Sequence, residues 1–182
     1  MPFFDLYKLY LSPHKEFVVK LKNILGFVPG NVVLYRMAFR HRSVAKVLKN
    51  GSRSSNERLE FLGDAVLGSI ISCYLYKNYP VANEGFLTQM KSKIVNRKNL
   101  NSLGEKLKLT DFIQNGGNGN LGENISGNLF EAFIGALYLD HGIDAARALI
   151  EHLWGPLIET ANGAPKHPKS ALQEWCAAHG RK

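Results

Sequence analysis

One stretch of the chain, residues 57–79, constrains the fold more than any other, because it has the length and spacing of a long helix with two unlike faces. At about 100° per residue, Glu57, Glu60 and Asp64 share a face only about 60° wide. The opposite face carries apolar side chains, at Leu59, Val66 and Ile70. Such a helix can bury one face in a core while its carboxylates line a cleft.

Helical spacing of apolar side chains continues through most of the chain, and no stretch alternates strongly like a β-strand. Two segments break the pattern as loops, the polar residues 49–56 and the Gly/Asn-rich residues 115–120. A chain of 182 residues can form one domain with a substantial core, but not two full ones. We therefore predict an all-α domain. Its further helices are expected within residues 17–25, 33–38, 87–94, 100–107, 127–139 and 144–158.

A second acidic segment lies in residues 127–136, with the sequence GNLFEAFIGA. Asn128 and Glu131 are three positions apart, so they share one face of a helix that is otherwise strongly apolar. A carboxylate in such surroundings is costly unless it is paired or binds a metal. Gly127 and Gly135 would permit a close approach to another helix.

The two acidic helices together suggest a metal site. Glu60, Asp64, Asn128 and Glu131 offer the oxygen ligands that a hard divalent cation such as Mg²⁺ prefers. Without a cation, carboxylates this close would raise one another's pKa and destabilise the fold. Two alternatives remain open, a solvated acidic face and an ion pair between Glu131 and a buried arginine such as Arg58.

The charge of the chain points to a polyanionic partner. Lys and Arg number 23 against 15 Asp and Glu, a formal net charge of +8, and residues 1–55 hold ten of the bases and two of the acids. Nucleic acid or an anionic membrane surface would suit such a charge. Two cysteines exclude a disulfide scaffold and a four-thiolate zinc site. No apolar run approaches the ~20 residues of a transmembrane helix, so we expect a cytoplasmic protein and no membrane partner.

Several segments carry a family resemblance. Residues 56–65 (NERLEFLGDA) closely resemble the signature motif of ribonuclease III, and residues 127–140 (GNLFEAFIGALYLD) are similar to its second acidic motif. Residues 38–43 (AFRHRS) and 83–100 (NEGFLTQMKSKIVNRKNL) resemble two further blocks of the family. The resemblance spans roughly residues 17–160 and implies the homodimeric, all-α ribonuclease III endonuclease fold.

The resemblance also implies a division of the chain. Residues 1–16 would be an N-terminal extension, residues 17–161 the endonuclease domain and residues 162–168 a linker. Residues 169–182, which open with KSALQEW, look like the beginning of a truncated double-stranded-RNA-binding domain.

Site residues follow from the match of individual positions. The resemblance assigns metal binding to Glu60, Asp64, Asn128 and Glu131, and within that set catalysis to Asp64 and Glu131. Glu57 and Glu84 match acids that position the substrate. Phe61 matches an aromatic residue that enters a pocket of the partner subunit. The helical wheel independently places Phe61 beside the acids, where it is exposed unless a neighbouring helix of its own chain covers it.

The implied activity is Mg²⁺-dependent hydrolysis of double-stranded RNA, with Mn²⁺ as a possible substitute and no small-molecule cofactor. Processing of rRNA and mRNA precursors would leave 5′-phosphate and 3′-hydroxyl ends with a short 3′ overhang. Duplex RNA also requires cationic contacts. The candidates flank the two acidic helices: Arg40, Arg42, Lys91, Lys93, Arg97 and Lys98.

Position 128 departs from the family, which usually has Asp where this chain has Asn. An amide oxygen can still bind a metal, but one negative charge is lost. The departure leaves open a catalytically weakened protein that binds duplex RNA without cutting it. An all-α nucleotide pyrophosphohydrolase, which also uses paired acidic helices and Mg²⁺, is a further alternative, although a small nucleotide does not require so basic a protein.

Overall fold

The computed structural model describes residues 3–47, 51, 53–116 and 121–163, with side chains as far as Trp154. Helices dominate this part of the chain, and its β pairing consists of two isolated bridges, Arg40 with Gln114 and Val47 with Arg53. The prediction of an all-α fold is confirmed. The α-helices are α1 (Phe3–Leu6), α2 (Lys15–Leu25), α3 (Val32–Ala38), α4 (Glu57–Asn78), α5 (Glu84–Ile94), α6 (Arg97–Lys106) and α7 (Ile125–Gly163). Shorter turns are the π-helical η1 (Tyr7–Leu11) and the 3₁₀ turns η2 (Arg42–Val44) and η3 (Leu109–Phe112).

Helix α7 contains both of the C-terminal helices expected from the sequence. The two parts meet at Gly142, whose φ of 81° and ψ of −175° interrupt the helix in a region that favours glycine. The second part continues to Gly163, so the first two residues of the predicted 162–168 linker are helical. Residues 164–182, which include the predicted start of an RNA-binding domain, lie outside the described residues.

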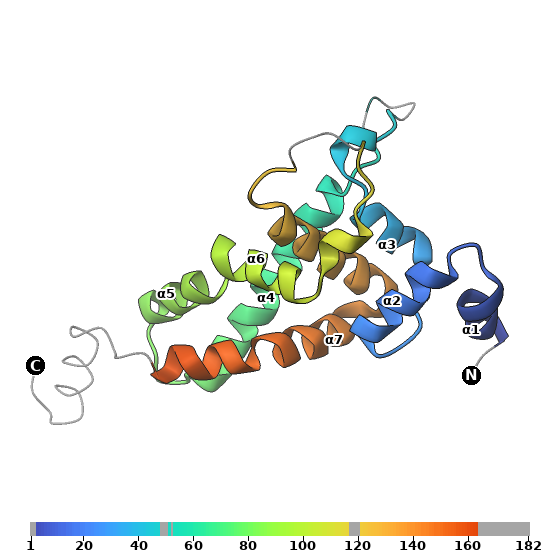
Figure 1. Cartoon of the computed structure of the whole chain (residues 1–182). Helices are drawn as coiled ribbons and strands as arrows, with labels where there is room; N and C mark the ends of the chain where they lie inside the picture. The colour runs from blue at the N-terminus through green and yellow to red at the C-terminus, as the bar shows by residue number, and fades with distance from the viewer. Residues whose placement is uncertain (1–2, 48–50, 52, 117–120, 164–182) are drawn as a thin grey trace, which may run out of the picture.

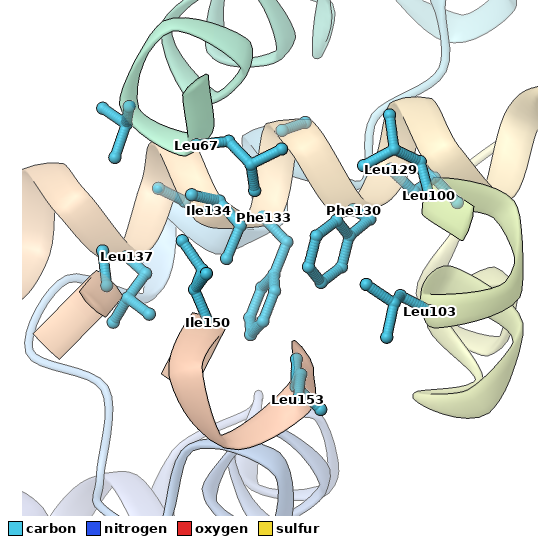
Figure 2. Close-up of a cluster of buried hydrophobic side chains, with 14 of the residues drawn as sticks. Leu67, Leu100, Leu103, Leu129, Phe130, Phe133, Ile134, Leu137, Ile150 and Leu153 are labelled. Atoms are coloured by element: carbon cyan, nitrogen blue, oxygen red, sulfur yellow. The ribbon is translucent and has the colours of Figure 1, made fainter. Parts of the chain in front are cut away.

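The first half of α7 forms the centre of the core (Figure 1). Its residues between Leu129 and Leu137 are fully buried apart from the nearly buried Glu131, because the fold covers this half-helix on all sides. Leu67 of α4 reaches it from one side, and Leu100 and Leu103 of α6 reach it from another (Figure 2). The second half of α7 folds back to add Ile150 and Leu153.

Helices α4 and α7 touch backbone to backbone where they cross. A Cβ atom built on Gly63 would overlap the carbonyl oxygen of Glu131, and one built on Gly135 would overlap the carbonyl oxygen of Leu59. A similar contact joins α6 to α7, where a Cβ atom on Gly104 would overlap a backbone carbonyl oxygen. The expected close approach at Gly135 is therefore present. It brings the acidic first turns of α4 directly beside Glu131.

Asp140 fastens the segment before α3 to the end of the first half of α7. Its carboxylate accepts hydrogen bonds from the backbone N–H groups of Gly30 (2.8 Å) and Asn31 (2.7 Å) and from the hydroxyl of Tyr35 (3.1 Å). His141 Nδ1 lies 2.9 Å from the same carboxylate. Burial and the neighbouring carboxylate raise the pKa of Tyr35 far above its ordinary value, so the phenol remains a donor.

The expectation that no apolar run approaches a transmembrane helix is wrong by length and composition, because α4 has a mean hydropathy of 1.3 over its most apolar 18-residue window. In this structure, apolar side chains of α4 pack in the core of the domain. Leu67, Ile70 and Ile71 are buried, while the acids lie on another face of the helix. A core helix of a folded domain meets the same length and composition criteria.

The crossing makes a prediction about stability. Gly63→Ala places a methyl group against a backbone carbonyl that cannot move aside, so we expect the free energy of unfolding to fall by about 1–3 kcal/mol or more. The measurement is urea unfolding followed by circular dichroism.

Gly68→Ala is the matched control on the same helix. Its new methyl group meets only the flexible end of Lys91, with Nζ at 3.2 Å, and alanine is the better helix former. Stability equal to or slightly above wild type is expected. Equal unfolding midpoints for the two variants would contradict a backbone contact at Gly63.

Candidate active site

An open pocket of about 340 Å³ lies where α4, α6 and α7 meet. Helices α4 and α7 are held there by the glycine crossing, and α6 is held against α7 by Gly104. The lining is almost entirely acidic, with one arginine and one phenylalanine: Glu57, Glu60, Phe61, Asp64, Arg97 and Glu131. The acids predicted from two distant segments thus face one space.

The four acids differ in their exposure to solvent. Glu57 and Asp64 are exposed and Glu60 is half-buried, whereas only 3% of Glu131 is exposed. Glu57 is oriented by the hydroxyl of Ser55, which donates to Oε2 at 2.8 Å. The pocket therefore has a buried carboxylate at its base and exposed carboxylates at its rim.

Burial raises the pKa of Glu131 from its ordinary 4.5 to about 7. Arg97 opposes this shift, and the negative charges of Asp64 and Glu60 add to it. Burial also raises the pKa of Glu60. The charge of Arg97 lowers this pKa, and the charges of Glu57 and Asp64 raise it further. Two of the carboxyls are thus destabilised in their ionised form, and an added cation would relieve both.

Arg97 supplies the positive charge that the pocket contains. Its Nη1 donates to Oδ1 of Asn128 at 2.8 Å and to Oε2 of Glu131 at 3.4 Å. Arg97 is the first residue of α6, directly after Asn96, whose side chain caps the helix by accepting from the Asn99 N–H at 2.9 Å. The arginine that pairs with Glu131 is therefore Arg97 and not Arg58, which is exposed on α4.

The oxygen-bearing side chains of the pocket have the ligand chemistry of a magnesium site, but they are not gathered as closely as the ligands of a bound ion. Across the described residues, no three His, Cys, Asp or Glu side chains form a ready metal-binding group. Glu60, Asp64 and Glu131 nonetheless line one pocket, and the amide oxygen of Asn128 shares a donor with Glu131. All four present oxygen. Within the described part of the chain, the charged partner of the buried Glu131 carboxylate is the Arg97 guanidinium at a long 3.4 Å, so the residues fit a hard divalent cation.

Phe61 and Glu84 occupy different places. Phe61 is 80% exposed at the edge of the acidic pocket, so the alternative in which its own chain covers it is wrong. Glu84 begins α5, where it accepts from the Thr88 hydroxyl at 2.8 Å. It lines a separate pocket of about 470 Å³ between α4 and α5, not the acidic one.

The six predicted RNA-contacting bases are also dispersed. Lys91 lines a polar pocket of about 580 Å³ with Asp64 and lies over Gly68. Arg40 is half-buried and donates to the Ser54 hydroxyl at 3.2 Å. The remaining bases are exposed, but one of them turns toward the acids: Arg42, Lys93, Lys98 and, in the acidic pocket, Arg97.

Two features of the site were not predicted from the sequence. Gly63 is the partner of Gly135 in the crossing, and its signal is a glycine within an otherwise strong helical pattern. The pairing of Arg97 with Asn128 and Glu131 spans more than 30 residues and leaves no local signal.

Comparison with known proteins places this site in a family. The family model described as Ribonuclease-III-like matches residues 31–156, well over half of the chain. Ribonuclease 3 of Flavobacterium psychrophilum is 44% identical over 182 aligned positions, covering 96% of this chain and 74% of that protein. Ribonuclease 3 of Zunongwangia profunda is 46% identical over 165 positions, covering 88% of this chain and 68% of that protein.

Solved structures agree with the sequence comparisons. The nuclease domain of ribonuclease III from Campylobacter jejuni aligns with a TM-score of 0.65 and 32% identity, covering 75% of this chain and 94% of that chain. Dicer from Pichia stipitis aligns with a TM-score of 0.56 and 28% identity, covering 72% of this chain and 57% of that chain. The acidic pocket lies within the matched residues 31–156, and the chain belongs to the ribonuclease III family.

Proposed function

We propose that this chain is a Mg²⁺-dependent endoribonuclease that hydrolyses double-stranded RNA in the acidic pocket. The observation that carries the proposal is the meeting of Glu60, Asp64 and Glu131, from two helices, in one pocket of a ribonuclease III family member. Water would add across a P–O3′ bond, so that phosphorus gains a hydroxyl and the departing O3′ gains a proton. The ends formed are a 5′-phosphate and a 3′-hydroxyl.

The acids would have three roles in this proposal, namely catalysis, metal binding and substrate positioning. Asp64 and Glu131 would act in catalysis and, with Glu60 and Asn128, hold Mg²⁺, with Mn²⁺ as a substitute. When bound, the ion would supply Lewis-acid activation of water and stabilise charge on the leaving oxygen. Glu57, oriented by Ser55, would position the substrate at the rim of the pocket.

The exposed bases would hold the RNA duplex. Double-stranded RNA presents a wide, shallow minor groove with 2′-hydroxyls, so recognition would depend on shape and phosphate position more than on base sequence. Arg42, Lys93 and Lys98 are exposed and suited to phosphate contacts. The proposed substrates are rRNA and mRNA precursors, and an enzyme that processes them would act in the cytoplasm.

A second copy of the chain would complete the enzyme. One acidic pocket would act on one strand, so cleavage of both strands with a short 3′ overhang would need two pockets. Phe61, large and exposed beside the acids, is suited to a partner's pocket. The nuclease domain from Campylobacter jejuni is likewise described as having structural flexibility in a region involved in dimer formation of that protein.

The two alternatives are less well supported. The family match does not favour a nucleotide pyrophosphohydrolase. The alternative of a protein that binds RNA without cutting it depends on Asn128 alone, whereas the relatives of this chain are named Ribonuclease 3. An amide oxygen such as that of Asn128 can still bind a divalent ion in place of a carboxylate oxygen.

Glu131→Gln tests the proposed activity. The substitution keeps the shape of the buried side chain but removes its charge, so we expect cleavage of duplex RNA in Mg²⁺ to fall more than about a hundredfold. Binding of the duplex, measured by gel shift, should stay within about twofold, because the exposed bases are unchanged.

Asn128→Asp, assayed beside it, is expected to cleave at lower Mg²⁺ concentrations than wild type, since it restores a charged ligand. Wild-type protein that binds the duplex but yields no product, at any Mg²⁺ concentration, would overturn the proposed enzyme. Full activity of Glu131→Gln would overturn the role of the buried carboxylate alone.

Phe61→Ala tests the proposed dimer. Truncation of an aromatic ring that fills a pocket typically costs about 3–5 kcal/mol, so the dimer should dissociate at concentrations where wild type sediments as a dimer. Tyr10→Ala removes another exposed aromatic ring, on η1, and should leave sedimentation unchanged. Identical sedimentation of Phe61→Ala and wild type would remove Phe61 from the interface.

A further inference from the structure

The position of the Arg97 guanidinium has a consequence for ion binding. Its Nη1 contacts Oδ1 of Asn128 and Oε2 of Glu131, at 2.8 and 3.4 Å. These two oxygens belong to two of the four residues proposed to hold Mg²⁺. An oxygen that accepts from a guanidinium at this distance cannot also face a divalent cation without bringing two positive charges together.

We propose that Arg97 is a built-in counterion, which neutralises the acidic pocket when no divalent ion is bound and leaves Asn128 and Glu131 when the ion arrives. This inference rests on the proposed function, since it takes Glu131 and Asn128 as ion ligands.

The charges around the pocket require such a counterion. Glu57, Glu60, Asp64 and Glu131 supply four carboxyls, and Arg97 is the single basic residue among the six that line the pocket. The backbone of Glu131 is held at the base by the crossing of α4 and α7, and only 3% of the residue is exposed to water. An ionised Glu131 without a partner would destabilise the folded protein more than an exposed carboxylate would.

The side chain of Arg97 is also exposed enough to move away from Asn128 and Glu131. It is 56% exposed, whereas the Glu131 side chain is 4% exposed. A long side chain rooted at the first turn of a helix can swing its charged end into water while its backbone stays in place. The cap by Asn96 uses that residue's own side chain, so α6 does not depend on where the guanidinium points.

Asn128 fits the same account. A neutral amide oxygen gives Arg97 a good acceptor without adding a further negative charge to the pocket. With one charge fewer than the usual aspartate, the site attracts a divalent ion less strongly, and a single guanidinium can compete with it.

Calorimetric titration of Mg²⁺ into ion-free protein at pH 8 tests the exchange without any RNA. Arg97→Gln removes the competitor, so Mg²⁺ should bind about fivefold more tightly than to wild type, the value expected of a half-exposed ion pair. Arg97→Lys keeps the charge but replaces the planar guanidinium with a compact ammonium, and should fall between the two. Lys106→Gln is the matched control, with the same loss of charge at the far end of α6.

Lys106 should not affect Mg²⁺ affinity. It is exposed and about 13 Å from Arg97 along the axis of α6, beyond the screening length of about 8 Å at physiological salt. Thermal unfolding provides a second measurement. Arg97→Gln should melt at a lower temperature than wild type in EDTA, and the difference should shrink in saturating Mg²⁺.

Equal or weaker Mg²⁺ binding by Arg97→Gln would overturn the inference, as would a loss of melting temperature that is the same with and without Mg²⁺. In either case, Mg²⁺ binding and RNA cleavage by wild type would leave the proposed function intact. Wild-type protein that binds no Mg²⁺ at all would overturn both.

Discussion

The structure depends on one backbone contact, the crossing of α4 and α7 at Gly63 and Gly135. A side chain at either position would overlap a carbonyl oxygen of the other helix, so the two helices can meet this closely only through glycine. The contact has two effects at once. It packs the apolar face of α4 against the buried first half of α7, and it seats the carboxylate of Glu131 beside Glu60 and Asp64. Fold and site are therefore products of the same crossing.

The crossing places the Glu131 carboxylate where burial disfavours its ionised form. Burial and acidic neighbours hold the pKa of Glu131 near 7. Since the unfolded chain releases this proton at about 4.5 and the folded chain near 7, the ion-free protein should lose stability as pH rises between those values, by about 3 kcal/mol. Below pH 4.5 this contribution to stability is fully present. The pKa near 7 already includes the opposing effect of Arg97, so a divalent ion at the carboxylate would be needed to offset the loss.

Local pattern explains which parts of the molecule could be predicted. The 3.6-residue period of α4 places Glu57, Glu60 and Asp64 on one side and leaves Phe61 exposed, and the structure has both. Gly63 and Arg97 act through segments distant in sequence, and periodicity carries no information about such partners. In the sequence, Arg97 looks the same as an exposed base proposed to contact RNA, such as Lys98. Only the placement of α6 against α7 turns its guanidinium toward the acids.

The pKa of Glu131 in the ion-free protein tests this account most directly, because it reports the burial, the neighbouring acids and the crossing together. Carbon-13 NMR of the labelled Glu131 carboxyl, titrated in EDTA, measures it. The account predicts a midpoint near 7, well above the ordinary 4.5, and a fall in the midpoint when Mg²⁺ replaces EDTA. A midpoint near 4.5 in EDTA, unchanged by Mg²⁺, would contradict it.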